Sequence, residues 1–241
     1  MPQIILPDTS LCAIVRDEMM NPAGGIFDFV ESTMPFVEYG VIVDTGSVDG
    51  TRETLEQLSG KYPNLKIFDR KFDGYATSRN FSLGKVGTKM ALVLDADERL
   101  TSGDFKKLAT LIDVGISGYN FDLTIVQPDM TVNGGGCHNP RLFVISPEVK
   151  YVGETTNEIL YIGDRIFNNT RAFSRITDRC KSTGIAIKHF LPSQKAQLMK
   201  VAFWYESLNE RSLKNGKTLN PSQLPCFQEW KAYNPMRDRY R

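Results

Sequence analysis

The sequence predicts an α/β protein whose central sheet is mostly parallel and is flanked by helices. Short apolar runs alternate with amphipathic stretches through the first half of the 241 residues. Runs of this length that are apolar at successive positions indicate strands buried on both faces, as in parallel sheets covered by helices. Several runs end in charged residues, and ligands bind beyond the carboxyl ends of the strands in such sheets.

The elements of the first half follow from local patterns. Four apolar runs predict strands, at residues 11–15, 39–44, 65–68 and 89–94. Four stretches have apolar residues at helical spacing and predict helices, at residues 25–36, 51–58, 75–86 and 101–114. This alternation indicates a parallel sheet that is covered by helices on both sides.

The pattern changes from about Gly118. Strands of a mixed sheet are predicted at 118–127 and 140–145, separated by a Gly-rich turn, NGGGCHNP, and a later strand at 185–190. An amphipathic helix is predicted at 193–213. We therefore expect one domain over residues 1–192 and a helical appendage over 193–241 that packs on the same domain.

Composition excludes several classes of protein. The formal net charge of +1 gives no case for nucleic-acid binding. No segment approaches the about 20 apolar residues that span a bilayer, and no basic region precedes the first apolar residues, so neither a transmembrane segment nor a secretory signal is expected. The four cysteines are scattered without a C-x-x-C pair, which favours reduced thiols in a cytoplasmic protein over zinc ligation.

Three carboxylates, Asp95, Asp97 and Glu98, follow the apolar run MALVL. Such close like charges raise one another's pKa unless a positive charge joins them. One interpretation is a helix N-terminus, where the helix dipole favours acidic residues. The other is a site for Mg²⁺ or Mn²⁺, because two carboxylates that flank one residue on a turn can both face a hard cation and its phosphates.

Asp44 ends another buried strand, where a carboxylate usually needs a hydrogen-bonded partner. A nucleobase imide or a ribose hydroxyl would satisfy it. The following DTGSVDGT is also a good turn, in which Asp49 or Thr51 could cap the next helix. Because the predicted strands are parallel, we expect Arg16, Asp44 and Asp95 to converge at one edge of the sheet.

Four segments resemble the family 2 glycosyltransferases with the GT-A fold: LCAIVRDE, VIVDTGSVDGT, GYATSRNFSL and ALVLDADERL, in that order. RLF, YVGETTNEI and IKHF continue the resemblance toward a bacterial subgroup of lipopolysaccharide-core glucosyltransferase-like proteins. The resemblance covers roughly residues 11–190. It implies a Rossmann-like nucleotide-binding half over 1–117 and an acceptor half over 118–192.

The resemblance assigns the donor-binding residues. Ala13, Val15 and Arg16 match the strand end that lines the nucleotide pocket, and Asp44 matches the acidic residue that reads the base. Arg79, in the SRN segment, matches a basic residue near the diphosphate.

The resemblance also assigns a metal site. Asp95 and Asp97 match the D-x-D pair, in which the second aspartate ligates Mn²⁺ or Mg²⁺ and the first lies near the ribose. His189 matches a late histidine that completes the metal's protein shell, although a histidine at a strand end is more often structural.

Glu158 aligns with the glutamate of a His-Glu pair and is the candidate general base, with Glu154 as a nearby alternative. The chain departs from the subgroup in two places: Asn157 replaces the histidine, and the first strand ends in RDE where relatives often have KNE.

These residues together predict an inverting, metal-dependent hexosyl- or pentosyltransferase. Its donor would be a nucleotide sugar, with UDP favoured, and its acceptor a hydroxyl of a glycan or glycoconjugate. A lipid-linked acceptor would place the protein peripherally at a membrane. Two alternatives stay open: a catalytically weak or inactive module that binds nucleotide sugar or glycan, and a phosphatase, because LVLDADERL resembles hhhDxDx[TV] with Arg99 at the last position.

Overall fold

A computed structural model describes residues 4–191 except 20, 154–158, 163–164 and 169–179. The helix predicted at 193–213 and the proposed appendage lie outside the described residues, as do the candidate bases Glu154 and Glu158. Within the described part of the chain, no helix is long and apolar enough to cross a membrane.

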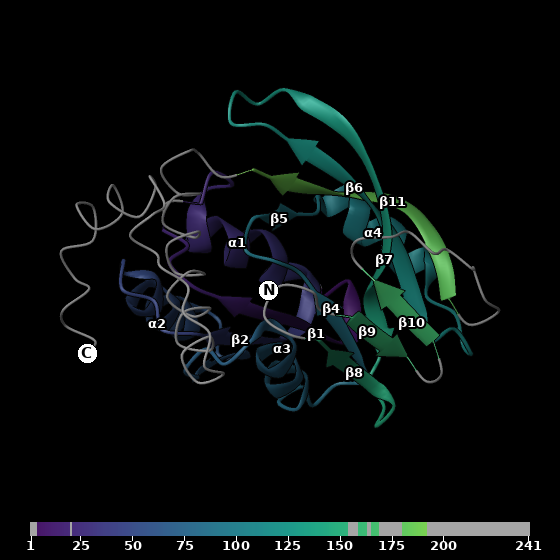
Figure 1. Cartoon of the computed structure of the whole chain (residues 1–241), viewed down its shortest axis with the longest axis horizontal. Helices are drawn as coiled ribbons and strands as arrows, with labels where there is room; N and C mark the ends of the chain where they lie inside the picture. Colours follow the sequence, from purple (N-terminus) through teal and green to yellow (C-terminus); the bar gives the residue numbers. More distant parts are fainter. Residues whose placement is uncertain (1–3, 20, 154–158, 163–164, 169–179, 192–241) are drawn as a thin grey trace, which may run out of the picture. The chain divides into compact units, whose positions relative to one another are not determined.

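The main sheet has eight strands in the order β3-β2-β1-β4-β7-β6-β11-β5 (Figure 1). Its strands are β1 (Leu6–Val15), β2 (Val37–Asp44), β3 (Leu65–Asp69), β4 (Met90–Val93), β5 (Glu98–Arg99), β6 (Gly118–Val126), β7 (Val132–Val144) and β11 (Cys180–Phe190). The first four are parallel, whereas β7 runs antiparallel to both β4 and β6. The predicted fold class, a mostly parallel sheet with a mixed second half, is confirmed.

Each face of the sheet is covered by its own layer. Helices α1 (Gly25–Thr33), α2 (Thr51–Lys61) and α4 (Ser102–Leu111), with the 3-10 turn η1 (Met34–Phe36), share one face. Helix α3 (Tyr75–Leu83) and a three-stranded antiparallel sheet of β8 (Val149–Val152), β9 (Ile159–Ile162) and β10 (Arg165–Asn168) cover the other. Because side chains alternate along a strand, Leu11 and Ala13 pack in the first layer and Cys12 in the second.

The Gly-rich segment NGGGCHNP was predicted as a turn, and this prediction is wrong. The segment lies inside β7. The turn of the β6–β7 ribbon comes earlier, where Gln127 N–H donates to Thr131 O at 2.8 Å and Met130 takes a φ of 66°. A Cβ at Gly135 would lie 3.1 Å from Leu123 O and from the Ile125 side chain. Gly135 therefore permits the close approach of β6 and β7.

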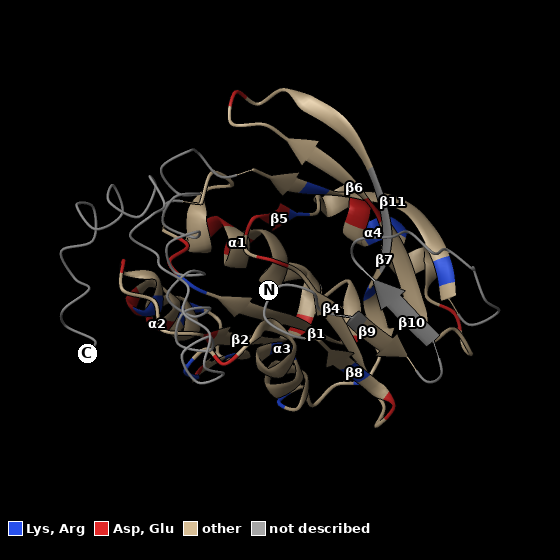
Figure 2. Ribbon diagram, viewed as in Figure 1, with Lys and Arg blue, Asp and Glu red and all other residues tan. Residues whose placement is uncertain are grey.

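The interpretation of the three carboxylates as a helix N-terminus is wrong. Helix α4 begins at Ser102, and its capping box joins Thr101 to Asp104. Glu98 and Arg99 instead form the short strand β5, which pairs with Lys188 and His189 of β11. Figure 2 shows acidic and basic positions interspersed over the described elements, with acidic ones at the turn before β5.

Candidate active site

The polar residues predicted to converge do lie at one edge of the sheet. Val15 of β1 pairs with Asp44 of β2, and Cys12 of β1 pairs with Val93 of β4, so these parallel strands end side by side. Asp95 follows two residues after the end of β4. This edge therefore brings together carboxylates that are far apart in the sequence.

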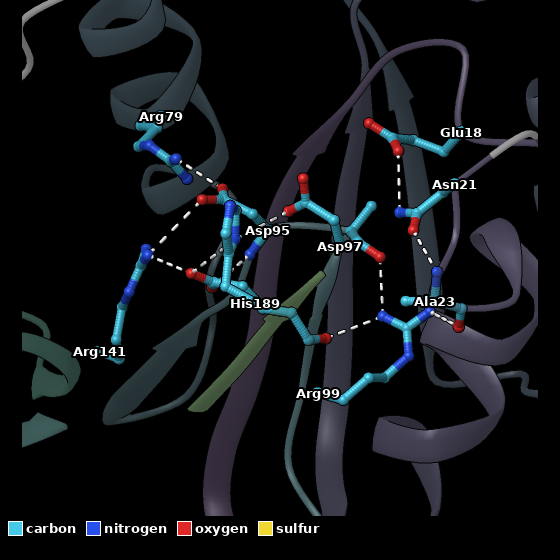
Figure 3. Close-up of polar contacts among 11 residues, drawn as sticks. Glu18, Asn21, Ala23, Arg79, Asp95, Asp97, Arg99, Arg141 and His189 are labelled. Atoms are coloured by element: carbon cyan, nitrogen blue, oxygen red, sulfur yellow. Dashed lines mark hydrogen bonds and ion pairs between the residues drawn. The ribbon is translucent and has the colours of Figure 1, made fainter. Parts of the chain in front are cut away.

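Asp95 lies between two arginines (Figure 3). Arg79 of α3 donates from Nη2 to Asp95 Oδ1 at 2.7 Å, and Nη2 of Arg141 of β7 lies 3.6 Å from Oδ2. Although burial disfavours its ionised form, the two guanidinium groups hold the pKa of Asp95 well below its usual range. Arg79 and Arg141 thus supply positive charge that offsets the repulsion among Asp95, Asp97 and Glu98.

Sequence reasoning missed Arg141 as a site residue, although RLF was recognised as a family pattern. Its Nη2 also donates to Oε1 of Glu98, whose side chain is 1% exposed. Burial raises the pKa of Glu98 to about 8, against the opposing charge of Arg141. Glu98 Oε2 in addition accepts from Asp95 N–H at 2.9 Å, so this carboxylate braces the turn. An arginine within the apolar strand PRLFV was the available signal.

Asp97 and His189 form the second part of the cluster. Asp97 Oδ1 lies 3.6 Å from His189 Nδ1, and Phe190 N–H donates to Asp97 O at 2.9 Å, which ties the turn to β11. Among the described residues, His189 Nδ1 is a buried polar atom without a hydrogen-bond partner. The structure therefore brings together the two residues predicted as metal ligands.

This pair fits a cation that takes most of its ligands from elsewhere. Over the described ranges, no group of three or more His, Cys, Asp or Glu side chains is arranged to hold a metal. Mg²⁺-type sites commonly use only one or two carboxylates and fill the other positions with substrate phosphates and water. Carboxylate oxygen also suits Mg²⁺ and Mn²⁺. The donor set is thus compatible with a metal that binds together with a phosphorylated substrate.

Asp44 has one oxygen engaged and one available. It is 3% exposed, and its Oδ1 accepts from the N–H groups of Gly46 at 2.7 Å and Ser47 at 2.8 Å. In the described part of the chain its Oδ2 is buried and has no hydrogen-bond partner. Gly46 has a φ of +106°, which favours glycine in this loop. A buried acceptor oxygen of this kind fits a ligand N–H or O–H donor.

The remaining predicted donor-binding residues have different surroundings. Arg16 donates from Nη1 to Thr45 O at 3.0 Å, and its Nε lies 3.6 Å from Asp17 Oδ2. The side chains of Ala13 and Val15 lie in the apolar core, 1% and 2% exposed. A nucleotide could therefore contact only the backbone of these two residues, while Arg16 lies at the end of their strand.

The fold is that of an α/β protein with a cluster of carboxylates and arginines at the carboxyl edge of its sheet. Residues 38–171, more than half of the chain, match the family model described as glycosyl transferase family 2. The chain belongs to this family.

Individual relatives are more distant. A cholesterol galactosyltransferase of Borreliella burgdorferi is 32% identical over 77 residues, which are 32% of this chain and 21% of that protein. The chain thus matches about a fifth of the length of this relative. The mannosyltransferase PcManGT from Pyrobaculum calidifontis, whose structure was solved in complex with GDP-Man and Mn²⁺, is similar in structure, with a TM-score of 0.53. The alignment covers 95% of this chain and 75% of that chain, with 13% sequence identity. This likeness shows the fold. A structure of S. aureus TarS 1-349 with UDP-GlcNAc aligns with 22% identity, a TM-score of 0.41 and coverage of 49% and 35%.

Proposed function

We propose that this protein is an inverting, metal-dependent glycosyltransferase that moves a sugar from a UDP-linked donor to a hydroxyl of a glycan or glycoconjugate. The observation that carries the proposal is that Asp44 Oδ2 and the Asp97–His189 pair lie at the same edge of the sheet, and that Asp44 Oδ2 and His189 Nδ1 have no hydrogen-bond partner among the described residues. Membership of glycosyl transferase family 2 supports the reaction class.

The state of Asp44 supports a uridine nucleotide over a guanosine nucleotide. Guanine presents an imide N–H beside an amino group, a pair that suits both oxygens of one carboxylate. Uracil presents a single imide N–H. Because Gly46 and Ser47 already occupy Oδ1, Asp44 offers one buried oxygen, which matches uracil. Since PcManGT was solved with GDP-Man and TarS with UDP-GlcNAc, a donor panel is the direct test.

On the leaving-group side, Asp97 and His189 would hold Mn²⁺ or Mg²⁺, which when bound stabilises the charge developing on the diphosphate. Arg79 and Arg141 keep Asp95 ionised beside this pair, so Asp95 can accept a hydrogen bond from the ribose. Arg79 and Arg141 also place positive charge at the same edge, where an anionic diphosphate would bind. Arg16 at the end of β1 is a further donor-binding candidate.

On the acceptor side, Glu158 is the proposed general base, and Glu154 is its alternative. A sugar hydroxyl is a poor nucleophile at neutral pH, so a carboxylate removes its proton as the oxygen attacks the anomeric carbon. One attack from the face opposite the diphosphate inverts the configuration. The proposal also includes membership of the lipopolysaccharide-core glucosyltransferase-like subgroup, a role in glycan biosynthesis and a hexosyl or pentosyl substrate. It further includes a cytoplasmic location, peripheral at a membrane if the acceptor is lipid-linked.

The deciding experiment is a thermal-shift screen of nucleotide sugars with and without Mn²⁺, followed by release of nucleoside diphosphate from the donor that stabilises most. A ligand that binds only the folded state raises the melting temperature by mass action. We expect a UDP-sugar to stabilise the protein more with Mn²⁺ than without it, and UDP to be released. Binding without any release, even with candidate acceptors, would favour the inactive binding module. Absence of binding by every nucleotide sugar would contradict the proposal.

A further inference from the structure

Arg99 makes four hydrogen bonds, all to backbone carbonyl oxygens. Its Nη1 donates to Ala96 O at 2.7 Å and to Glu98 O at 2.8 Å. Its Nη2 donates to Ala23 O at 2.8 Å and to Gly25 O at 3.1 Å. The guanidinium also lies over the ring of Phe29, 5.4 Å from its centroid.

The first two carbonyl groups belong to the residues on either side of Asp97. Arg99 therefore closes the turn that presents this carboxylate, as Figure 3 shows. Burial lowers the pKa of Arg99 to about 10, which leaves the guanidinium protonated at neutral pH. A buried charge satisfied by several carbonyl dipoles keeps a defined geometry, because each lost hydrogen bond would leave part of that charge unsolvated.

The other two carbonyl groups lie just before and at the start of α1, in a part of the chain that is itself held in place. Asn21 donates from Nδ2 to Glu18 Oε2 at 3.0 Å, and Ala23 N–H donates to Asn21 Oδ1 at 2.9 Å. Glu18 N–H in turn donates to Thr51 Oγ1 at 2.8 Å at the start of α2. Arg99 thus connects the turn around Asp97 to an anchored segment of the nucleotide-binding half.

We propose that Arg99 is a positioning residue for Asp97: its forked guanidinium fixes the turn from Ala96 to Glu98 so that the Asp97 carboxylate faces His189 and can bind a divalent cation. This inference rests on the metal dependence in the proposed function. A lysine keeps the charge but lacks the planar fork that serves two carbonyl pairs at once. The arrangement therefore requires arginine and not just a cation.

The test measures Mn²⁺ binding by calorimetry and by electron paramagnetic resonance in the presence of UDP, for the wild type, Arg99→Lys and Arg99→Met. We expect Mn²⁺ affinity to fall at least tenfold in Arg99→Met and by a smaller factor in Arg99→Lys. Lys107→Met is the matched control, because Lys107 Nζ also donates to a backbone carbonyl, Gly184 O at 2.7 Å, but links α4 to a part of β11 that makes no contact with the turn around Asp97. Its Mn²⁺ affinity should equal that of the wild type.

The outcomes separate this inference from the proposed function. If the wild type binds no Mn²⁺ with UDP, the metal dependence of the proposed function fails, and with it the inference. If the wild type binds Mn²⁺ and Arg99→Lys binds it equally well, only the inference about Arg99 is overturned. This comparison tests the inference even if Arg99→Met does not fold. Melting temperatures of all variants show whether a lost affinity accompanies lost folding. A loss of Mn²⁺ affinity in Lys107→Met equal to that in Arg99→Lys would also overturn the inference.

Discussion

Asn80 and Tyr151 are joined by two hydrogen bonds: Asn80 Nδ2 donates to Tyr151 O at 2.7 Å, and Tyr151 N–H donates to Asn80 Oδ1 at 2.8 Å. Tyr151 belongs to β8, an edge strand of the three-stranded sheet, so the amide occupies the place of a neighbouring strand. The guanidinium of Arg79, the preceding residue of α3, lies 5.7 Å from the centroid of the Tyr151 ring. The helix that supplies a partner of Asp95 is thereby tied to the second half of the chain.

Asn80→Ala should lower the free energy of unfolding by about 1–3 kcal/mol, because the N–H and C=O of Tyr151 lose their partners at a partly buried position. Denaturant titration measures the change. Asn64→Ala is the control, since Asn64 makes a hydrogen bond to Glu38 O at the opposite end of the sheet. An unchanged free energy of unfolding in Asn80→Ala would show that the link to β8 adds no stability.

Asp97→Ala should abolish metal-dependent transfer and leave the fold intact. Removing one of three neighbouring carboxylates relieves repulsion, so the melting temperature of the metal-free protein should hold or rise slightly. Transfer assays with Mn²⁺ and with excess EDTA, together with thermal unfolding, measure both effects. Full activity in this variant, or in EDTA, would remove the metal assignment.

Asp44→Ala should weaken UDP binding measured by calorimetry, and raise the KM for the donor more than it lowers kcat, because the base does not react. Asp44→Asn is the sharper variant. It keeps an acceptor for the amides of Gly46 and Ser47 but replaces the unpartnered oxygen by an N–H donor. Unchanged UDP affinity in Asp44→Asn would exclude the assigned contact with the base.

Above pH 8, where the Glu98 carboxyl is ionised, Arg141→Met should destabilise the fold by about 3–5 kcal/mol, because it leaves this buried carboxylate without its partner. The control is Arg52→Met, whose ion pair with the exposed Asp69 is worth about 0–1 kcal/mol. Adding Glu98→Gln to Arg141→Met should recover much of the loss, which denaturant titration would detect. No recovery in the double variant would mean that the stabilising role of Arg141 depends on Asp95 instead.

Glu158→Gln should keep donor affinity and lower kcat at saturating donor by about 10²–10⁴-fold, the usual contribution of a general base. Single-turnover transfer measures the rate, and calorimetry confirms that the donor still binds. Glu154→Gln is the comparison variant, because a base at that position would reverse the ranking. Transfer at the wild-type rate by Glu158→Gln would place the base elsewhere.

Local patterns in the sequence were sufficient for the first four strands and the four helices of the first half, but not for the short strand β5. The strand ending at Asp44 was predicted at residues 39–44 and spans Val37–Asp44 in the structure. It was recognisable because a strand buried on both faces is apolar at nearly every position. The convergence of Asp44 and Asp95 also followed, since parallel strands end at a common edge. The Gly-rich part of β7 was predicted wrongly, because glycine marks both tight turns and close strand approach, and only the neighbouring strand distinguishes them.

Tertiary structure alone decided how the charges of the site are matched. The partners of Asp95 come from α3 and β7, and the carbonyl groups bound by Arg99 come from the turn around Asp97 and from the start of α1. No spacing in the chain encodes these contacts, because they depend on which strands and helices become neighbours after folding. Hydrophobic periodicity in the sequence indicates which residues are buried, but it does not indicate which residues they contact. Ion pairs and the hydrogen bonds of a guanidinium group depend on those contacts.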